Sequence, residues 1–226
     1  MAPGDATLPL WERPEMVERF AARDPDHRLA RLAAMYALPS YVRALDLGCA
    51  GGRNAVFLAR LGFQVTALDS SRAMVAETRR RLAELVGPAE AADRVREAGM
   101  DTLRGVADGS IDLFVALGIF HQAESETEWD RALAEARRVC APGAWMLAAC
   151  FTDESDPHGT GLLPVAGDPH IFEGMEARRV HLVSAGVLDR EMARHGFLPV
   201  MPTETVRVPV EGGGRRVTAN GLYLRA

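Results

Sequence analysis

Two carboxylates and a run of small residues predict a nucleoside site. Segment 43–53 reads RALDLGCAGGR, in which an apolar run ends at Leu47 and a helical pattern begins near Asn54. A strand, a tight turn and a helix in that order leave free N–H groups at the helix start, which can bind a ligand. Asp69 ends a second apolar run, 63–68. At the tip of a neighbouring strand its carboxylate can accept hydrogen bonds from two ribose hydroxyls.

The glycine spacing argues against a dinucleotide. No register of GCAGG, residues 48–52, gives the G-x-G-x-x-G pattern that makes room for a pyrophosphate. The turn instead resembles motif I of the class I S-adenosylmethionine (SAM) methyltransferases, D-x-G-x-G-x-G. Asp46, Gly48 and Gly52 match that motif, and Ala50 replaces its middle glycine. We expect Ala50 to have a backbone conformation that any L-residue tolerates. The alternative is an ordinary glycine-rich turn between a strand and a helix.

The resemblance implies SAM as the cofactor and a role for each matching residue. In that family the residue at the position of Asp46 supports the turn and hydrogen-bonds near the methionyl end. The backbone at Gly48 and Ala50 contacts the same end, and Asp69 holds the ribose hydroxyls. The resemblance also places four further residues along the cofactor: Gly52, Ser70, Met74 and Leu117.

The adenine contact is left open between two neighbours. Segment 108–112, DGSID, resembles the lead of that family into its fourth strand. The family also carries Gly-Asp-Ala after its third strand, where the Asp meets the adenine amino group, whereas residues 99–101 read Gly-Met-Asp here. Counting back from residue 108 aligns Met100 with the Asp of the family. Asp101 is the neighbour whose carboxylate could accept a hydrogen bond from the adenine amino group. Asp101 could equally cap the turn that follows it.

His121 is the candidate general base. It lies in GIFHQ, residues 118–122, just beyond the predicted fourth strand, and ligands of open sheets bind outside the carboxyl ends of the strands. An imidazole has an ordinary pKa suited to proton transfer near neutral pH. A base is needed only where the nucleophile arrives protonated, as a hydroxyl does. The alternative role is a pocket wall or a helix cap.

No metal site is predicted. The acidic stretch 153–158 has no partner at a recognisable ligand spacing, so it is interpreted as a solvated loop. The three cysteines also lack such spacing, and any single disulfide would leave one of them unpaired, which suits a reducing cytosol.

Composition excludes several classes of partner. The chain has 226 residues, 48% of them hydrophobic, and a net charge of −5. It is long enough for one domain with elaborations, and it has no general electrostatic attraction for nucleic acid or anionic lipid. There is no signal-peptide pattern and no apolar run of 18 residues. We therefore expect a cytoplasmic protein with a small-molecule substrate and with no nucleic-acid or membrane partner.

The order of elements predicts an α/β fold. It is a Rossmann-like doubly wound sheet, mostly parallel, with an antiparallel C-terminal hairpin and an N-terminal helical cap over 1–40. Asp24-Pro25 is expected to start a cap helix, and 41–226 to form the main domain. The strands are expected at 42–47, 63–68, 95–98, 111–117 and 144–151, followed by an antiparallel pair, 197–210 and 216–224.

Serine, proline and glycine residues indicate where the predicted helices begin and end. Helices are expected to start near Asn54 and after Ser70-Ser71, Ser125 and Ser184. Pro142-Gly143 is expected to stop the helix that starts after Ser125. Residues 152–175 are rich in glycine and proline and are interpreted as a long loop that covers the substrate.

The sequence therefore predicts a SAM-dependent methyltransferase that acts on an O, N, S or C nucleophile of a small metabolite or natural-product intermediate. One alternative is a SAM-binding partner protein without catalysis. The other is a nicotinamide-dependent oxidoreductase, which the missing glycine pattern and the complete absence of lysine disfavour. Substrate identity and the choice between monomer and homodimer stay open.

Overall fold

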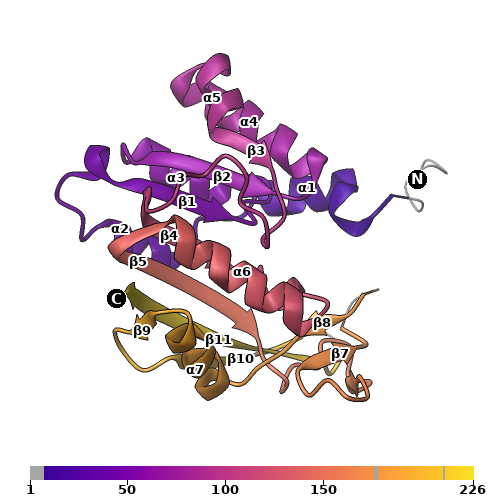
Figure 1. Ribbon diagram of the computed structural model, residues 1–226. Coiled ribbons are helices and arrows are strands. Elements are labelled where there is room, and N and C mark those ends of the chain that lie inside the picture. Colours follow the sequence, from indigo (N-terminus) through magenta and orange to yellow (C-terminus); the bar gives the residue numbers. More distant parts are fainter. Residues whose placement is uncertain (1–7, 176–177, 211) are drawn as a thin grey trace. The chain divides into compact units, whose positions relative to one another are not determined.

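The chain divides into two compact units, residues 1–99 and 100–226. The structure, a computed structural model, describes residues 8–175, 178–210 and 212–226 (Figure 1). The units are called the first and the second unit, and each is described by itself. The division predicted at residue 40 stays a prediction.

The first unit holds a parallel sheet in the order β1–β2–β3. Its strands are β1 (Arg43–Leu47), β2 (Gln64–Asp69) and β3 (Val95–Glu97). Helices α3 (Arg53–Arg60) and α4 (Arg72–Val86) connect them. The predicted strand, turn and helix that carry the motif are confirmed.

The α4 helix begins and ends with the residues that the sequence indicates. Ser71 is its N-cap and accepts a hydrogen bond from the Met74 amide, and Gly87 (φ +86°) ends it. A short helix that the sequence reading did not anticipate, α5 (Pro88–Arg94), follows at once. Pro88 suits its first turn because that position needs no N–H.

The N-terminal segment of the first unit is helical, as expected, but its second helix starts later. Asp26 is the N-cap, not Asp24, because the Asp26 carboxylate accepts the Arg28 amide at 2.9 Å. The elements are η2 (Leu10–Glu12), α1 (Pro14–Ala21), α2 (His27–Ala33) and η3 (Pro39–Tyr41).

The second unit is built around two long strands. β5 (Cys140–Phe151) pairs in parallel with β4 (Ile111–Leu117) and antiparallel with β11 (Arg215–Arg225). On its other edge β11 pairs antiparallel with β9 (Phe197–Pro199) and β10 (Glu204–Pro209). The predicted antiparallel C-terminal pair is confirmed, although its first strand is broken in two.

Strand β5 starts earlier than predicted. Helix α6 (Glu126–Val139), capped by Ser125, ends before Cys140, so Pro142-Gly143 does not stop it. The β4–β5 register shifts between the pairs Ile111–Cys140 and Leu113–Trp145. Pro142 and Gly143 lie in this irregular start of the strand, where a residue without an N–H is tolerated.

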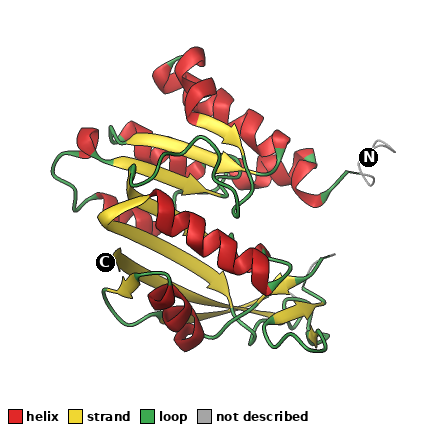
Figure 2. Ribbon diagram, viewed as in Figure 1, coloured by secondary structure: helices red, strands yellow, loops and turns green. Residues whose placement is uncertain are grey.

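Segment 152–175 is not a loop throughout. β6 (Leu163–Pro164) and β7 (Ile171–Glu173) form a small antiparallel sheet with β8 (Val180–His181). It has its own apolar cluster around Met175, Val180 and Leu182. Helix α7 (Ala185–Arg194), capped by Ser184, follows it (Figure 2). Together the parallel pairs, the connecting helices and the terminal hairpin confirm the predicted Rossmann-like α/β class.

Candidate active site

The glycine-rich turn after β1 is tied to the end of β2. The amides of Gly48 and Cys49 both donate to the Leu68 carbonyl, at 2.8 and 3.0 Å. Gly48 (φ +69°) and Gly52 (φ +81°) adopt the left-handed conformation, and a Cβ at Gly52 would lie 3.0 Å from the Thr78 side chain. Glycine is therefore required at Gly52 both for its backbone and for its neighbour.

Ala50 differs from the expectation for it. Its φ is +47°, the left-handed region that L-residues avoid. The Ala50 amide donates to Asp69 Oδ2 at 2.9 Å, and its carbonyl accepts from Thr78 Oγ1 at 2.6 Å. These two hydrogen bonds stabilise the left-handed conformation of Ala50. Replacing the motif glycine by alanine therefore adds backbone strain as well as a methyl group.

The Asp69 carboxylate links the turn to the next helix. Oδ2 accepts the Ala50 amide and Oδ1 accepts the Ser71 amide, each at 2.9 Å. Burial raises the pKa of this carboxyl, and the amides of Ser71 and Ala50 oppose that rise. An ionised carboxylate offers about four acceptor sites, so about two remain for hydroxyl groups. That is the number a ribose diol requires.

Asp46 is buried, with 1% of its surface exposed. Among the described residues its Oδ2 atom has no hydrogen-bond partner. Burial raises the pKa of Asp46 to about 7, against the opposing effects of the Arg53 charge and the Ala55 amide. An unpartnered buried carboxylate oxygen is the atom that a cationic group would satisfy. The residues present therefore fit SAM, whose methionyl end carries an ammonium group.

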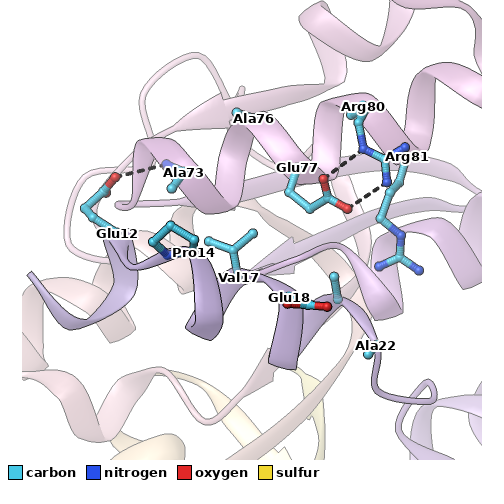
Figure 3. Close-up of a pocket in the computed structure, with 11 residues that line it drawn as sticks. Glu12, Pro14, Val17, Glu18, Ala22, Ala73, Ala76, Glu77, Arg80 and Arg81 are labelled. Carbon is cyan, nitrogen blue, oxygen red and sulfur yellow. Dashed lines mark hydrogen bonds and ion pairs between the residues drawn. The ribbon is translucent and has the colours of Figure 1, made fainter. Parts of the chain in front are cut away.

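Glu12 is a contact that the sequence reading missed. Its Oε1 and Oε2 atoms accept the Arg72 and Ala73 amides at 2.9 and 3.1 Å, at the N-terminus of α4 (Figure 3). Ser71 Oγ donates to the Trp11 carbonyl at 2.9 Å. Nothing in the sequence pattern pairs residues 60 positions apart. This contact fixes the N-terminal segment beside the end of β2.

Helix α1 also lies against the glycine-rich turn. A Cβ at Gly51 would come within 2.7 Å of Ala21, so glycine is needed for that close approach. A groove of about 730 Å³ lies between α1 and α4. Figure 3 shows residues that line it, with the Glu77–Arg80 ion pair among them. Asp46 and Asp69 are not among its lining residues, so this groove is separate from the motif residues.

Other predicted cofactor residues of the first unit have mixed environments. Ser70 is exposed, and the Met74 side chain, only 1% exposed, belongs to the core. In the second unit, Met100 is mostly buried and Asp101 forms an ion pair with Arg131 at 2.9 Å. Leu117 ends β4 as expected.

His121 has a different electrostatic environment from the one expected. It lies in the single turn η4 (Phe120–Gln122) and is 2% exposed, with its ring edge-to-face against Phe151 at 4.7 Å. Burial, and then the Arg178 charge, lower the pKa of His121 to about 3. The ring is therefore neutral at physiological pH. The expectation of an ordinary pKa is wrong for this structure.

Metal-ligating residues do not gather in the described parts of the chain. Across them, no group of three or more His, Cys, Asp or Glu side chains could hold a metal ion. Cys49, Cys140 and Cys150 are free and buried. Within the same residues no helix is long and apolar enough to span a bilayer.

Comparison with known proteins identifies the family. Residues 45–148, which include the glycine-rich turn and Asp69, match the family described as "Methyltransferase domain". This segment is a methyltransferase domain. The chain therefore contains a methyltransferase domain, which makes it an enzyme with SAM as its cofactor. A search of curated proteins by sequence finds no match.

Solved structures share the fold at low identity. A SAM-dependent methyltransferase from Methanosarcina mazei is 16% identical over 90% of this chain and 99% of its own, with a TM-score of 0.65. A 1,6-didemethyltoxoflavin N1-methyltransferase from Burkholderia thailandensis, with bound 1,6-didemethyltoxoflavin and S-adenosylhomocysteine, is 20% identical over 94% and 80%, with a TM-score of 0.62. The [4+2]-cyclase SpnF is 25% identical over 79% and 60%, with a TM-score of 0.55.

Proposed function

We propose that this methyltransferase transfers the SAM methyl group to an O, N, S or C nucleophile of a small molecule, a metabolite or natural-product intermediate. The observation that carries the proposal is the Asp69 carboxylate, which lies 2.9 Å from the Ala50 amide of the glycine-rich turn. This contact supports a site in which Asp69 binds the ribose hydroxyls and the glycine-rich turn binds the methionyl end of a sulfonium nucleoside.

The small-molecule assignment rests on charge and on likeness. The net charge of −5 does not favour nucleic acid, and the Burkholderia structure of the same fold holds a small heterocycle. The free, buried cysteines fit a cytoplasmic protein. We extend the proposal to a cytoplasmic enzyme without a nucleic-acid partner.

The bound cofactor supplies a methyl carbon already activated by a positive sulfur. The task of the chain is to align the nucleophile and to exclude water. Asp46 and Asp69 hold and orient the cofactor, and Met100 or Asp101 contacts the adenine in this proposal.

His121 has one of two roles. It is neutral and can accept a proton from a hydroxyl nucleophile, but its pKa of about 3 makes it a weak base. A thiolate or a free amine requires no such base, and His121 is then part of the substrate-binding wall. His121→Ala separates the two roles: SAM binding is retained, and turnover falls only if the acceptor is a hydroxyl.

The direct test is binding and transfer by the purified protein. Thermal unfolding with SAM, S-adenosylhomocysteine and NAD should show stabilisation by the first two. Tritium from methyl-labelled SAM should then appear in a member of a metabolite panel. Stabilisation by NAD alone would refute the proposal.

A second function has one observation in its favour. SpnF shares the fold and is named for a cyclisation. A SAM-binding protein that transfers no methyl group would bind SAM in the thermal assay and leave the whole panel unlabelled.

A further inference from the structure

The side chains of His121 and Gln122 form a buried polar pair with unmet hydrogen-bonding capacity. They are 2% and 8% exposed. Gln122 Nε2 lies 3.0 Å from His121 Nε2. Elsewhere among the described residues, neither His121 Nδ1 nor Gln122 Oε1 has a hydrogen-bond partner. An unpaired buried polar group destabilises the folded state, so native proteins retain few of them outside functional sites.

The hydrogen bond between the two side chains determines which of the two unpaired atoms is a donor and which is an acceptor. Because the Gln122 amide donates to His121 Nε2, the imidazole proton lies on Nδ1. The pair then has one free donor, His121 Nδ1–H, and one free acceptor, Gln122 Oε1. If the amide is turned by half a rotation, His121 Nδ1 becomes the acceptor and the Gln122 NH₂ group the donor. Either arrangement offers one donor and one acceptor.

The surroundings place this pair at the end of a strand. η4 follows β4, and a Cβ at Gly118 would lie 3.8 Å from His121 Cε1, the carbon between the two ring nitrogens. The nitrogen-bearing edge of the ring therefore lies beside the carboxyl end of β4, where open α/β sheets bind their ligands. Arg178 donates to the Gln122 carbonyl at 2.9 Å and pairs with Glu124 at 2.8 Å, which holds the turn in place.

We infer that His121 and Gln122 select a methyl acceptor that carries both a hydrogen-bond donor and a hydrogen-bond acceptor, as a cyclic amide does with its N–H and C=O groups. This inference rests on the proposed function and specifies its substrate class. A ligand with both groups supplies the type of partner that each of the two unmatched atoms lacks. A molecule with only one of the two groups leaves one buried atom unpaired, and buried polar sites discriminate strongly against such analogues.

Two cyclic amides that differ by one hydrogen-bond donor test the inference. The protein, saturated with S-adenosylhomocysteine and labelled with ¹⁵N-histidine, is titrated with 2-piperidone and with N-methyl-2-piperidone. We expect 2-piperidone to shift the His121 Nδ1 resonance and to bind about tenfold more tightly than its N-methyl derivative, the effect of one hydrogen bond. Equal binding of the two probes, or no response from His121, would overturn the inference.

Gln122→Leu removes the amide group and keeps an apolar side chain of similar size in the turn. It should bind 2-piperidone about tenfold more weakly than the wild type and should no longer distinguish the two probes. Gln64→Leu changes the other glutamine of the chain, which lies in the first unit and bonds the Ser40 carbonyl, and should retain wild-type discrimination. Unchanged discrimination in Gln122→Leu contradicts the inference. If this variant does not fold, the comparison of the two probes on the wild-type protein tests the inference by itself.

Calorimetry with SAM on cofactor-free samples of the same proteins separates the two proposals. Loss of SAM binding would count against the proposed function. Retained SAM binding without a preference for 2-piperidone would count against this inference alone.

Discussion

Asp69 has one observed role and one proposed role at the scale of single residues: it holds the turn together, and in the proposed function it binds the ribose hydroxyls. Asp69→Ala should weaken SAM binding by about 2–3 kcal/mol, since hydrogen bonds to a charged acceptor are lost. Titration calorimetry measures this change. Asp93→Ala, an exposed carboxylate in α5 of the same unit, should bind SAM as the wild type does. Unchanged affinity in Asp69→Ala would refute the assigned site.

Asp46 should link cofactor binding to pH. Its pKa of about 7 means that it is largely protonated below neutrality, and a cationic ligand requires the ionised form. SAM affinity should therefore rise as pH increases from 5.5 to 7 and level off above 7, with release of a proton on binding. Calorimetry in two buffers of different ionisation enthalpy detects that proton. In Asp46→Asn the affinity should be low and independent of pH.

Ala50 stores backbone strain that glycine would release. A left-handed alanine costs about 1–2 kcal/mol, and glycine loses about 0.5–1 kcal/mol through its freer unfolded chain. Ala50→Gly should therefore raise the free energy of unfolding by about 0.5–1 kcal/mol, measured by urea denaturation. A fall in stability would show that the methyl group of Ala50 makes contacts worth more than the strain.

At the scale of elements, Glu12 acts as a cap for a helix to which it does not belong. Burial opposes its ionisation, but the hydrogen bonds from Ser71, Ala73 and Arg72 lower the pKa of Glu12 below its usual value. Glu12→Ala should lower the free energy of unfolding by about 1 kcal/mol, as loss of an N-cap does, and should speed amide hydrogen exchange in α1. Glu15→Ala, an exposed residue of α1, is the matched control. Equal exchange rates in the two variants would contradict the capping role.

Elements were predictable where a local pattern determines them. The caps Ser71, Ser125 and Ser184 and the apolar run of β4 lie where the sequence indicates them, because caps and buried strands depend on adjacent residues. The early start of β5 depends on its irregular pairing with β4, and no local signal reports such a register shift. The two-residue strands of the small sheet are too short to show a period.

The site was predictable to the same extent. The contact between Asp69 and the glycine-rich turn follows from strand order, which the sequence reveals. The φ of Ala50, the burial of His121 and the Glu12 contact depend on tertiary packing, so residue types and spacing could not predict them.

At the scale of the whole molecule, Asp46 and His121 have opposite effects on stability as pH changes. The folded-state pKa of Asp46 is raised from 3.8 to about 7, so its contribution to stability falls as pH rises between these values. The pKa of His121 is lowered from 6.5 to about 3, so its contribution falls as pH drops through that range. Each amounts to about 1.4 kcal/mol per pH unit, and the two largely cancel between pH 4 and 6.5.

Single variants should expose each contribution. As pH falls from 6.5 to 5.5, the free energy of unfolding of Asp46→Asn should drop by about 1 kcal/mol more than that of the wild type. That of His121→Gln should rise by a similar amount relative to the wild type. Urea denaturation at the two pH values measures both. Parallel pH profiles for the wild type and both variants would show that neither group has a perturbed pKa.

The pairing of β11 has a consequence for biosynthesis. Strands β1, β2 and β3 all emerge from the ribosome within the first hundred residues, so the first unit can assemble its sheet early. β5 is complete at residue 151, but the strand that covers its edge spans residues 215–225. During translation of the intervening segment, that edge is open to pairing with other nascent chains. Chaperone dependence of this protein should therefore concentrate in the interval between the synthesis of β5 and the arrival of β11.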